Sequence, residues 1–124
     1  MGEKITSFTD LNAWRESHAL VLEIYSLTKS FPKEEVFGLV GQMRRSAVSI
    51  TSNIAEGFSR GSHKDKIHFY RMTVGSLTEL QNQLLIGRDI GYTDTIKFSE
   101  LAEKTVVVSK LINGLIKSIS SRIL

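Results

Sequence analysis

The sequence has 124 residues, of which 41 % are hydrophobic and 23 % charged, so we expect one globular domain spanning residues 1–124. Zero cysteines exclude a disulfide framework and a thiolate metal site, and they favour a cytoplasmic protein. No secretion signal is visible, and the longest apolar runs are too short to span a bilayer. The net charge of +3 permits an anionic partner without requiring one.

Four helical segments are predicted in chain order. After a loose terminus of about residues 1–7, the first runs to about residue 29, with Ser7 as its cap and Asp10 in its first turn. The second runs from about 39 to 59, and the third from a cap at Ser62 to about 89. Thr93 or Asp94 caps the fourth. Short connections between four helices predict an all-α, up-down-up-down antiparallel four-helix bundle.

Apolar side chains repeat at helical spacing in every segment. The first helix carries two adjacent stripes, and together they form a wider surface than one neighbouring helix can cover. One stripe consists of Trp14, Val21, Tyr25 and Thr28, and the other of Leu20, Ile24, Leu27 and Phe31. The second helix has one core stripe of Leu39, Met43, Ala47, Ile50 and Ile54. The third has a broad face of Ile67, Tyr70, Val74, Leu77, Leu84 and Leu85, and the fourth a stripe of Phe98, Leu101, Thr105, Val108, Ile112, Leu115 and Ile119.

The second helix also carries two faces that an ordinary surface helix lacks. Its polar stripe consists of Gln42, Arg45, Ser49, Asn53, Glu56 and Arg60, and a third face has the smaller residues Gly41, Val48, Ser52, Ala55 and Ser59. One interpretation of the polar stripe is a solvated surface on which Glu56 and Arg60 pair. The other is a contact with a second subunit, in which Arg44 or Arg45 reaches a carboxylate such as Glu79 or Glu56.

Residues 58–71 form a basic segment whose net charge of +3 equals that of the whole chain. Lys64, His68 and Arg71 fall on one helical face, and Arg60 approaches from the preceding loop. Such a cluster is either a phosphate footprint or a solvated helix start, and for one isolated chain we weigh the two equally. The candidate nucleic-acid-binding residues are Arg60, Lys64, Lys66, His68 and Arg71.

The spacing of the histidine, acidic, serine and glycine residues gives no motif for catalysis or metal binding. No Glu-x-x-His pair occurs, and His63 and His68 do not share a helix face, so we expect no metal. There is no phosphate-binding glycine loop and no spaced serine, histidine and carboxylate set. We therefore expect no catalytic residues and no cofactor, and give little weight to an enzyme with a site between subunits.

One stretch carries a family resemblance. Residues 49–57 read SITSNIAEG and follow Arg44 and Arg45, and the agreement continues at Phe8, Leu11, Trp14, Phe31, Pro32, Gly38, Leu39, Gly91 and Tyr92. This pattern resembles small bacterial four-helix-bundle proteins encoded in intervening sequences of 23S rRNA genes. It is also similar to their relatives, the accessory (variability determinant) proteins of diversity-generating retroelements. The resemblance covers about residues 8–115, and Thr51 departs from it because the family often has a helix-bending proline there.

The resemblance implies a homo-oligomer, because the retroelement branch looks like a ring of five bundles. It favours the subunit interpretation of the polar stripe, with interface or motif residues Arg44, Arg45, Ser49, Asn53, Glu56, Gly57 and Glu79. It also implies a reverse transcriptase as partner if the protein is associated with a retroelement. Our leading hypothesis is a non-enzymatic oligomer that binds RNA or DNA without sequence preference. The alternative is a protein-binding scaffold that does not bind nucleic acid.

Overall fold

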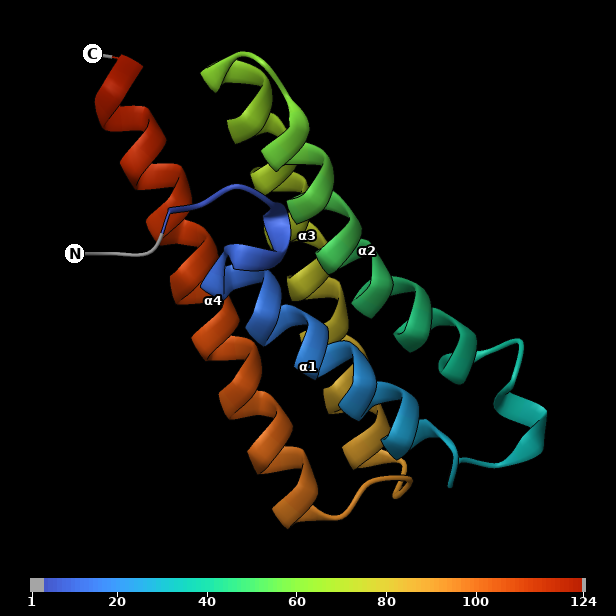
Figure 1. Ribbon diagram of the computed structural model, residues 1–124. Coiled ribbons are helices and arrows are strands. Elements are labelled where there is room, and N and C mark those ends of the chain that lie inside the picture. Colours follow the sequence, from blue (N-terminus) through green and yellow to red (C-terminus); the bar gives the residue numbers. More distant parts are fainter. Residues whose placement is uncertain (1–3, 124) are drawn as a thin grey trace.

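The computed structural model describes residues 4–123, and these form the predicted antiparallel four-helix bundle (Figure 1). The long helices are α1 (Asn12–Thr28), α2 (Leu39–Ser59), α3 (His63–Asp89) and α4 (Thr95–Ile123). Two short 3-10 turns, η1 (Phe8–Asp10) and η2 (Lys33–Glu35), precede α1 and α2. Each long helix packs against the helices next to it in sequence, and α1 also packs against α4, which closes the bundle.

Side-chain caps fix where the helices begin. The Ser62 hydroxyl accepts a hydrogen bond from the Asp65 backbone N–H at 3.1 Å, as predicted for α3. For α4, Asp94 rather than Thr93 is the cap, because its Oδ1 accepts from the Lys97 N–H at 2.8 Å. None of the described helices is long and apolar enough to cross a membrane.

The start of the first helix differs from the prediction. Ser7 and Asp10 do form a capping box, but it closes only η1. Leu11 then adopts an extended conformation (φ −76°, ψ 130°), so α1 begins at Asn12 rather than at Ser7. Residues 4–6 lie outside any helix, although the Thr6 N–H donates to Asp10 Oδ2 at 3.0 Å. The expected loose terminus also includes residues 1–3, which lie outside the described residues.

Helix α2 is continuous through Thr51, the position at which the sequence departs from the resembled pattern. The Thr51 hydroxyl donates to the Val48 carbonyl at 2.9 Å, a bond that a helix accommodates without a break. Thr51 also keeps the backbone N–H that a proline would lack.

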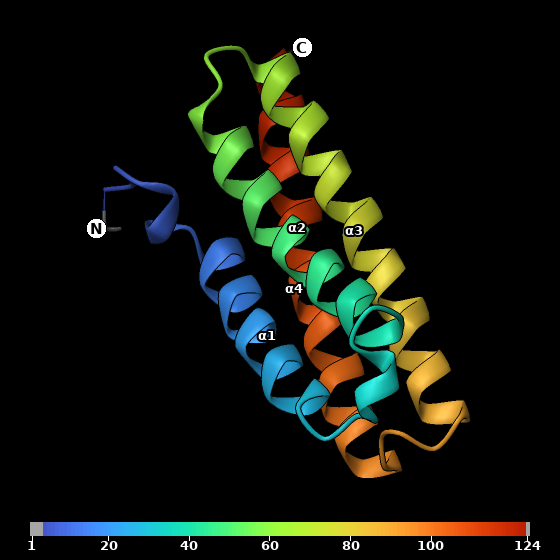
Figure 2. The same cartoon turned by 90° about the vertical axis from the view of Figure 1, so that its right-hand side faces the viewer.

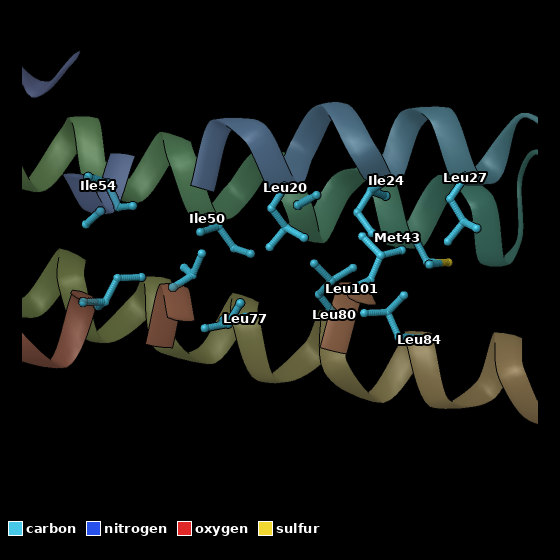
Figure 3. Packing of buried hydrophobic residues seen from close by; sticks show 14 of the residues in the cluster. Leu20, Ile24, Leu27, Met43, Ile50, Ile54, Leu77, Leu80, Leu84 and Leu101 are labelled. Carbon is cyan, nitrogen blue, oxygen red and sulfur yellow. The ribbon is translucent and has the colours of Figure 1, made fainter. Parts of the chain in front are cut away.

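The core contains aliphatic side chains from all four helices (Figure 3). Leu20, Ile24, Met43 and Leu80 are fully buried, together with Leu101 from α4. Gln81 lies at the edge of this core and donates to the Thr105 hydroxyl at 3.1 Å, which gives its amide one partner. The predicted core face of α3 is wrong at Leu85, which is 41 % exposed because it lies on the outer side of the α3–α4 contact.

The helices have unequal lengths, and this shapes one end of the bundle. Helix α1 has 17 residues, whereas α3 has 27 and α4 has 29. The last turns of α4 therefore extend beyond the start of α1, next to the turn between α2 and α3 (Figure 1). Figure 2 shows the same end with the η1 segment beside it. The basic segment lies at this end.

Candidate nucleic-acid interface

The turn between α2 and α3 positions the basic segment. Arg60 leaves α2 in an extended conformation (φ −73°, ψ 147°), and Gly61 and Ser62 complete the turn. The Lys66 ammonium donates to the Phe58 carbonyl at 2.6 Å and lies 3.4 Å from the Gly57 carbonyl. Lys66 thus gives the Phe58 carbonyl at the end of α2 a hydrogen-bond partner, and its charge complements the negative end of that helix.

Four predicted binding residues form an exposed basic cluster, which we define as Arg60, Lys64, His68 and Arg71. The guanidinium of Arg60 lies 4.6 Å from the centre of the Phe69 ring and pairs with Glu56 at 2.8 Å. The centre of the His68 ring lies 5.3 Å from that of Phe69, with the two ring planes at 78°. Phe69 thereby holds two members of the cluster in fixed positions.

The fifth predicted binding residue, Lys66, differs from the rest of the set. It is half-buried, and its side chain points back to the end of α2 rather than outward with Lys64. The spacing of charges in the sequence gives no sign of this, because the acceptors are backbone carbonyl groups. The structure instead brings Arg122, from the last turn of α4, to the pocket beside Lys66 and His63. The predicted antiparallel topology could have indicated this position of Arg122, since it places the end of the fourth helix beside the start of the third.

The two consecutive arginines of α2 contact opposite neighbours. Arg44 extends to α1, where Nε donates to the Thr28 hydroxyl at 2.9 Å and the guanidinium lies 4.6 Å from the centre of the Tyr25 ring. Arg45 extends to α3 and forms an ion pair with Glu79 of the same chain, while Gln42 Oε1 accepts from its Nε at 3.1 Å. Both arginines therefore fasten α2 within the bundle.

The rest of the polar stripe follows the seam between α2 and α3. The hydroxyls of Ser49 and Ser76 lie 2.8 Å apart, and the Asn53 amide donates to the Ser49 carbonyl at 2.9 Å. Glu56 pairs with Arg60 as the four-residue spacing predicted, and both side chains are more than 40 % exposed. Within one chain, the stripe is a row of contacts at the edge of the α2–α3 packing, open to solvent on its outer side.

At Gly57, side-chain atoms of α3 lie close against the backbone of α2. A Cβ atom at this position would lie 2.7 Å from Tyr70 Cε1 and 3.1 Å from Phe69 Cβ. Real Cβ atoms do not come so near to a ring carbon, so the close packing of Tyr70 requires glycine here. This gives a physical role to the last residue of the SITSNIAEG stretch.

Histidine and acidic side chains do not gather into a metal-binding group within residues 4–123. No group of three or more histidine and acidic side chains in this range is placed to hold an ion. Among the same residues, the ion pairs do not include Lys64, Lys66 or Arg71. What the site offers is unpaired positive charge beside aromatic rings.

Fold and site together define a small helical-bundle protein with a basic end and a glycine-containing contact between its second and third helices. The chain belongs to the 23S rRNA-intervening sequence protein family, whose model matches residues 9–114. That range includes the SITSNIAEG stretch and the whole basic segment.

A solved structure supports the fold. It is a protein of unknown function from the S23 ribosomal protein family of Bacteroides thetaiotaomicron, 23 % identical, with a TM-score of 0.79 over 85 % of this chain and 95 % of that one. At this identity the likeness concerns the fold alone. No curated protein matches the sequence.

Proposed function

We propose that the chain is a non-enzymatic, homo-oligomeric protein of the cytoplasm that binds nucleic acid without sequence preference through its basic cluster. The observation that carries this proposal is the unpaired charge of Lys64 and Arg71. Both are exposed, and neither takes part in the ion pairs found among residues 4–123. Positive groups of this kind suit phosphate oxygens, which carry charge but no sequence information.

Oligomerisation would multiply this surface. The family resemblance leads us to propose a ring, most simply of five copies, in which each subunit adds its own basic cluster. Several weak phosphate contacts on one assembly raise the overall affinity without any new kind of contact. RNA or DNA would then bind along the ring, and a reverse transcriptase would join it in a retroelement setting.

The salt dependence of binding tests the proposal. We expect saturable binding that weakens steeply with added salt, by about 0.9 in log K per log salt for each phosphate contacted on duplex DNA and about 0.7 on single strands. The double variant Lys64→Ala/Arg71→Ala should flatten this slope equally for unrelated sequences. Fluorescence anisotropy of a labelled oligonucleotide, followed through a salt titration, measures the slope.

A control variant separates position from total charge. Lys29 and Lys33 are exposed at the opposite end of the bundle, beyond the end of α1 (Figure 1). Lys29→Ala/Lys33→Ala removes the same charge but should leave the slope unchanged. If the two double variants behave alike, or if no nucleic acid binds saturably at low salt, the proposal fails.

The alternative function, a scaffold for another protein, is favoured by exposed apolar side chains near η2. Phe37 is 98 % exposed and Val36 51 % exposed, and Leu22 on α1 is 58 % exposed. Such side chains suit a protein contact better than a phosphate backbone. In this case the nucleic-acid titration should give weak, non-saturating binding that the Lys64→Ala/Arg71→Ala variant barely changes.

A further inference from the structure

A pocket of about 290 Å³ lies at the end of the bundle that α1 does not reach. Helix α4 continues past the start of α1, so its last turns face α2 and α3 without an opposing helix. The segment containing Ile5 and Leu11 crosses this end and forms one wall of the pocket. We call this space the end pocket. It arises from the unequal helix lengths and not from a gap in the core.

The floor of the end pocket is apolar and aromatic. Phe58 comes from the end of α2, Tyr70 from α3, and Leu115 and Ile119 from α4. Tyr70 is only 2 % exposed, and its burial raises the pKa of its phenol. Tyr70 therefore contributes to the wall of the pocket but offers an occupant almost no exposed ring surface.

The rim of the end pocket is basic. His63, Lys66 and Arg122 line it, and among residues 4–123 no acidic residue does. Lys66 is held in place by the carbonyls of α2, 5.3 Å from the centre of the Phe58 ring, and its charge is not neutralised by a carboxylate of the described chain. Such a pocket suits a ligand with two parts, a planar, uncharged ring that lies on the aromatic side chain and an anionic backbone that contacts the cationic groups.

We propose that the end pocket receives an unpaired nucleobase of a single-stranded RNA or DNA segment, while Lys66 and Arg122 contact the phosphates beside it. This inference rests on the proposed function, and it adds that the end of the bundle with the basic cluster prefers single-stranded nucleic acid. The basic cluster then continues the path of the backbone along α3. Bases of any type can stack on an aromatic ring, and the partly exposed Phe58 is the ring that the pocket offers. The pocket therefore prefers single strands without reading their sequence.

Three ligands of equal length test the pocket: a single strand, the same strand with every base removed, and a duplex. All three carry phosphates, but only the first has a base free to enter. We expect the single strand to bind about 5- to 150-fold more tightly than the abasic strand, the range that base stacking contributes per site. Competition against one fluorescent strand at fixed salt measures all three affinities.

A pocket-filling variant links this preference to the site. Ser118 lies on the rim of the end pocket and is exposed, so Ser118→Phe should occupy the opening without disturbing the core. We expect this variant to bind the single and abasic strands with nearly equal affinity. Asn113→Phe places the same side chain on an exposed site of α4 outside the pocket and should keep the preference. Thermal unfolding checks that both variants are folded.

A second pair of variants tests the rim. Arg122→Gln should lower the salt slope for the single strand, whereas Lys110→Gln, an equal loss of charge elsewhere on α4, should not. The inference is overturned if the parent protein binds the abasic and normal strands equally, or if Ser118→Phe and Asn113→Phe give the same result. Tight, salt-dependent binding with no preference for free bases would refute the pocket and leave the proposed function standing. Absence of any saturable binding would refute both.

Discussion

Arg44 and Arg45 show how neighbouring residues acquire different tasks in this fold. Successive helical positions are about 100° apart, so consecutive side chains leave α2 in different directions. Arg44 reaches the Thr28 hydroxyl on α1, and Arg45 reaches Glu79 on α3. Each guanidinium therefore fastens α2 to one of the helices beside it. Either arginine can still meet a second subunit, but in the single chain both already have partners.

Glu56 provides a prediction at the same scale. Its side chain is 48 % exposed and its partner Arg60 is 42 % exposed, which describes a surface ion pair. Replacing Glu56 with alanine should therefore lower the free energy of unfolding by less than about 1 kcal/mol. Thermal and denaturant unfolding of the two proteins measure the difference. A loss of about 3–5 kcal/mol, with a change in oligomer size, would instead show that a second copy buries the pair.

At the scale of elements, the contact between α2 and α3 depends on the absence of a side chain at Gly57. The helices approach closely enough for the Tyr70 ring to lie against the α2 backbone. Tyr70 in turn forms part of the end pocket, so Gly57 affects the site as well as the packing. A glycine inside a helix normally weakens it by about 0.5–1 kcal/mol relative to alanine, and here the close contact offsets that cost.

Gly57→Ala should destabilise the protein by about 1–3 kcal/mol, because the added methyl group clashes with a ring that is packed on all sides. Gly75→Ala is the matched control. Gly75 lies within α3, and a Cβ there would meet nothing within 4 Å. This control should raise the stability by about 0.5–1 kcal/mol through the better helix propensity of alanine. Equal effects of the two substitutions, measured by denaturant unfolding, would contradict the close contact.

At the scale of the whole molecule, the single bundle leaves apolar side chains in contact with water. Phe37 is 98 % exposed, and Leu22 and Tyr25 of α1 are 58 % and 38 % exposed. Large apolar side chains that are exposed to this extent become covered when copies of a chain associate. The two apolar stripes predicted for the first helix are mostly covered within the single chain, because Thr28 is buried and Trp14 and Val21 pack against the core. Of the predicted stripe residues, Tyr25 remains exposed.

We therefore expect the protein to self-associate at micromolar concentration. Analytical ultracentrifugation should show a species larger than the 13.9 kDa chain. Leu22→Ser/Phe37→Ser should shift the distribution toward the monomer with little change in its melting temperature, because neither side chain is buried. Ile96→Ser on α4, where the parent residue is 75 % exposed, serves as the control and should leave the assembly intact. A sharp monomer for the parent protein would rule out the ring.

The sequence by itself determined the four helices, most of their ends and the antiparallel topology. Caps such as Ser62 and the stripe containing Met43 and Ile50 are local patterns, and local patterns follow from the helical repeat and from backbone hydrogen bonding. The break at Leu11 was not predicted, since the capping box at Ser7 and Asp10 closes a short turn as readily as a long helix. The positive charge of the basic segment also follows directly from its amino-acid composition.

Only the tertiary structure decided how distant residues meet. Arg45 and Glu79 are 34 residues apart, and their pairing depends on how far α2 and α3 slide along one another, which helical periodicity leaves open. The same register turns Lys66 toward the carbonyls of α2 and brings Arg122 to the end pocket. The pocket itself exists because α1 is shorter than the helices it faces. Packing brings residues from segments that are distant in the sequence together, and it thereby turns a basic surface into a basic pocket.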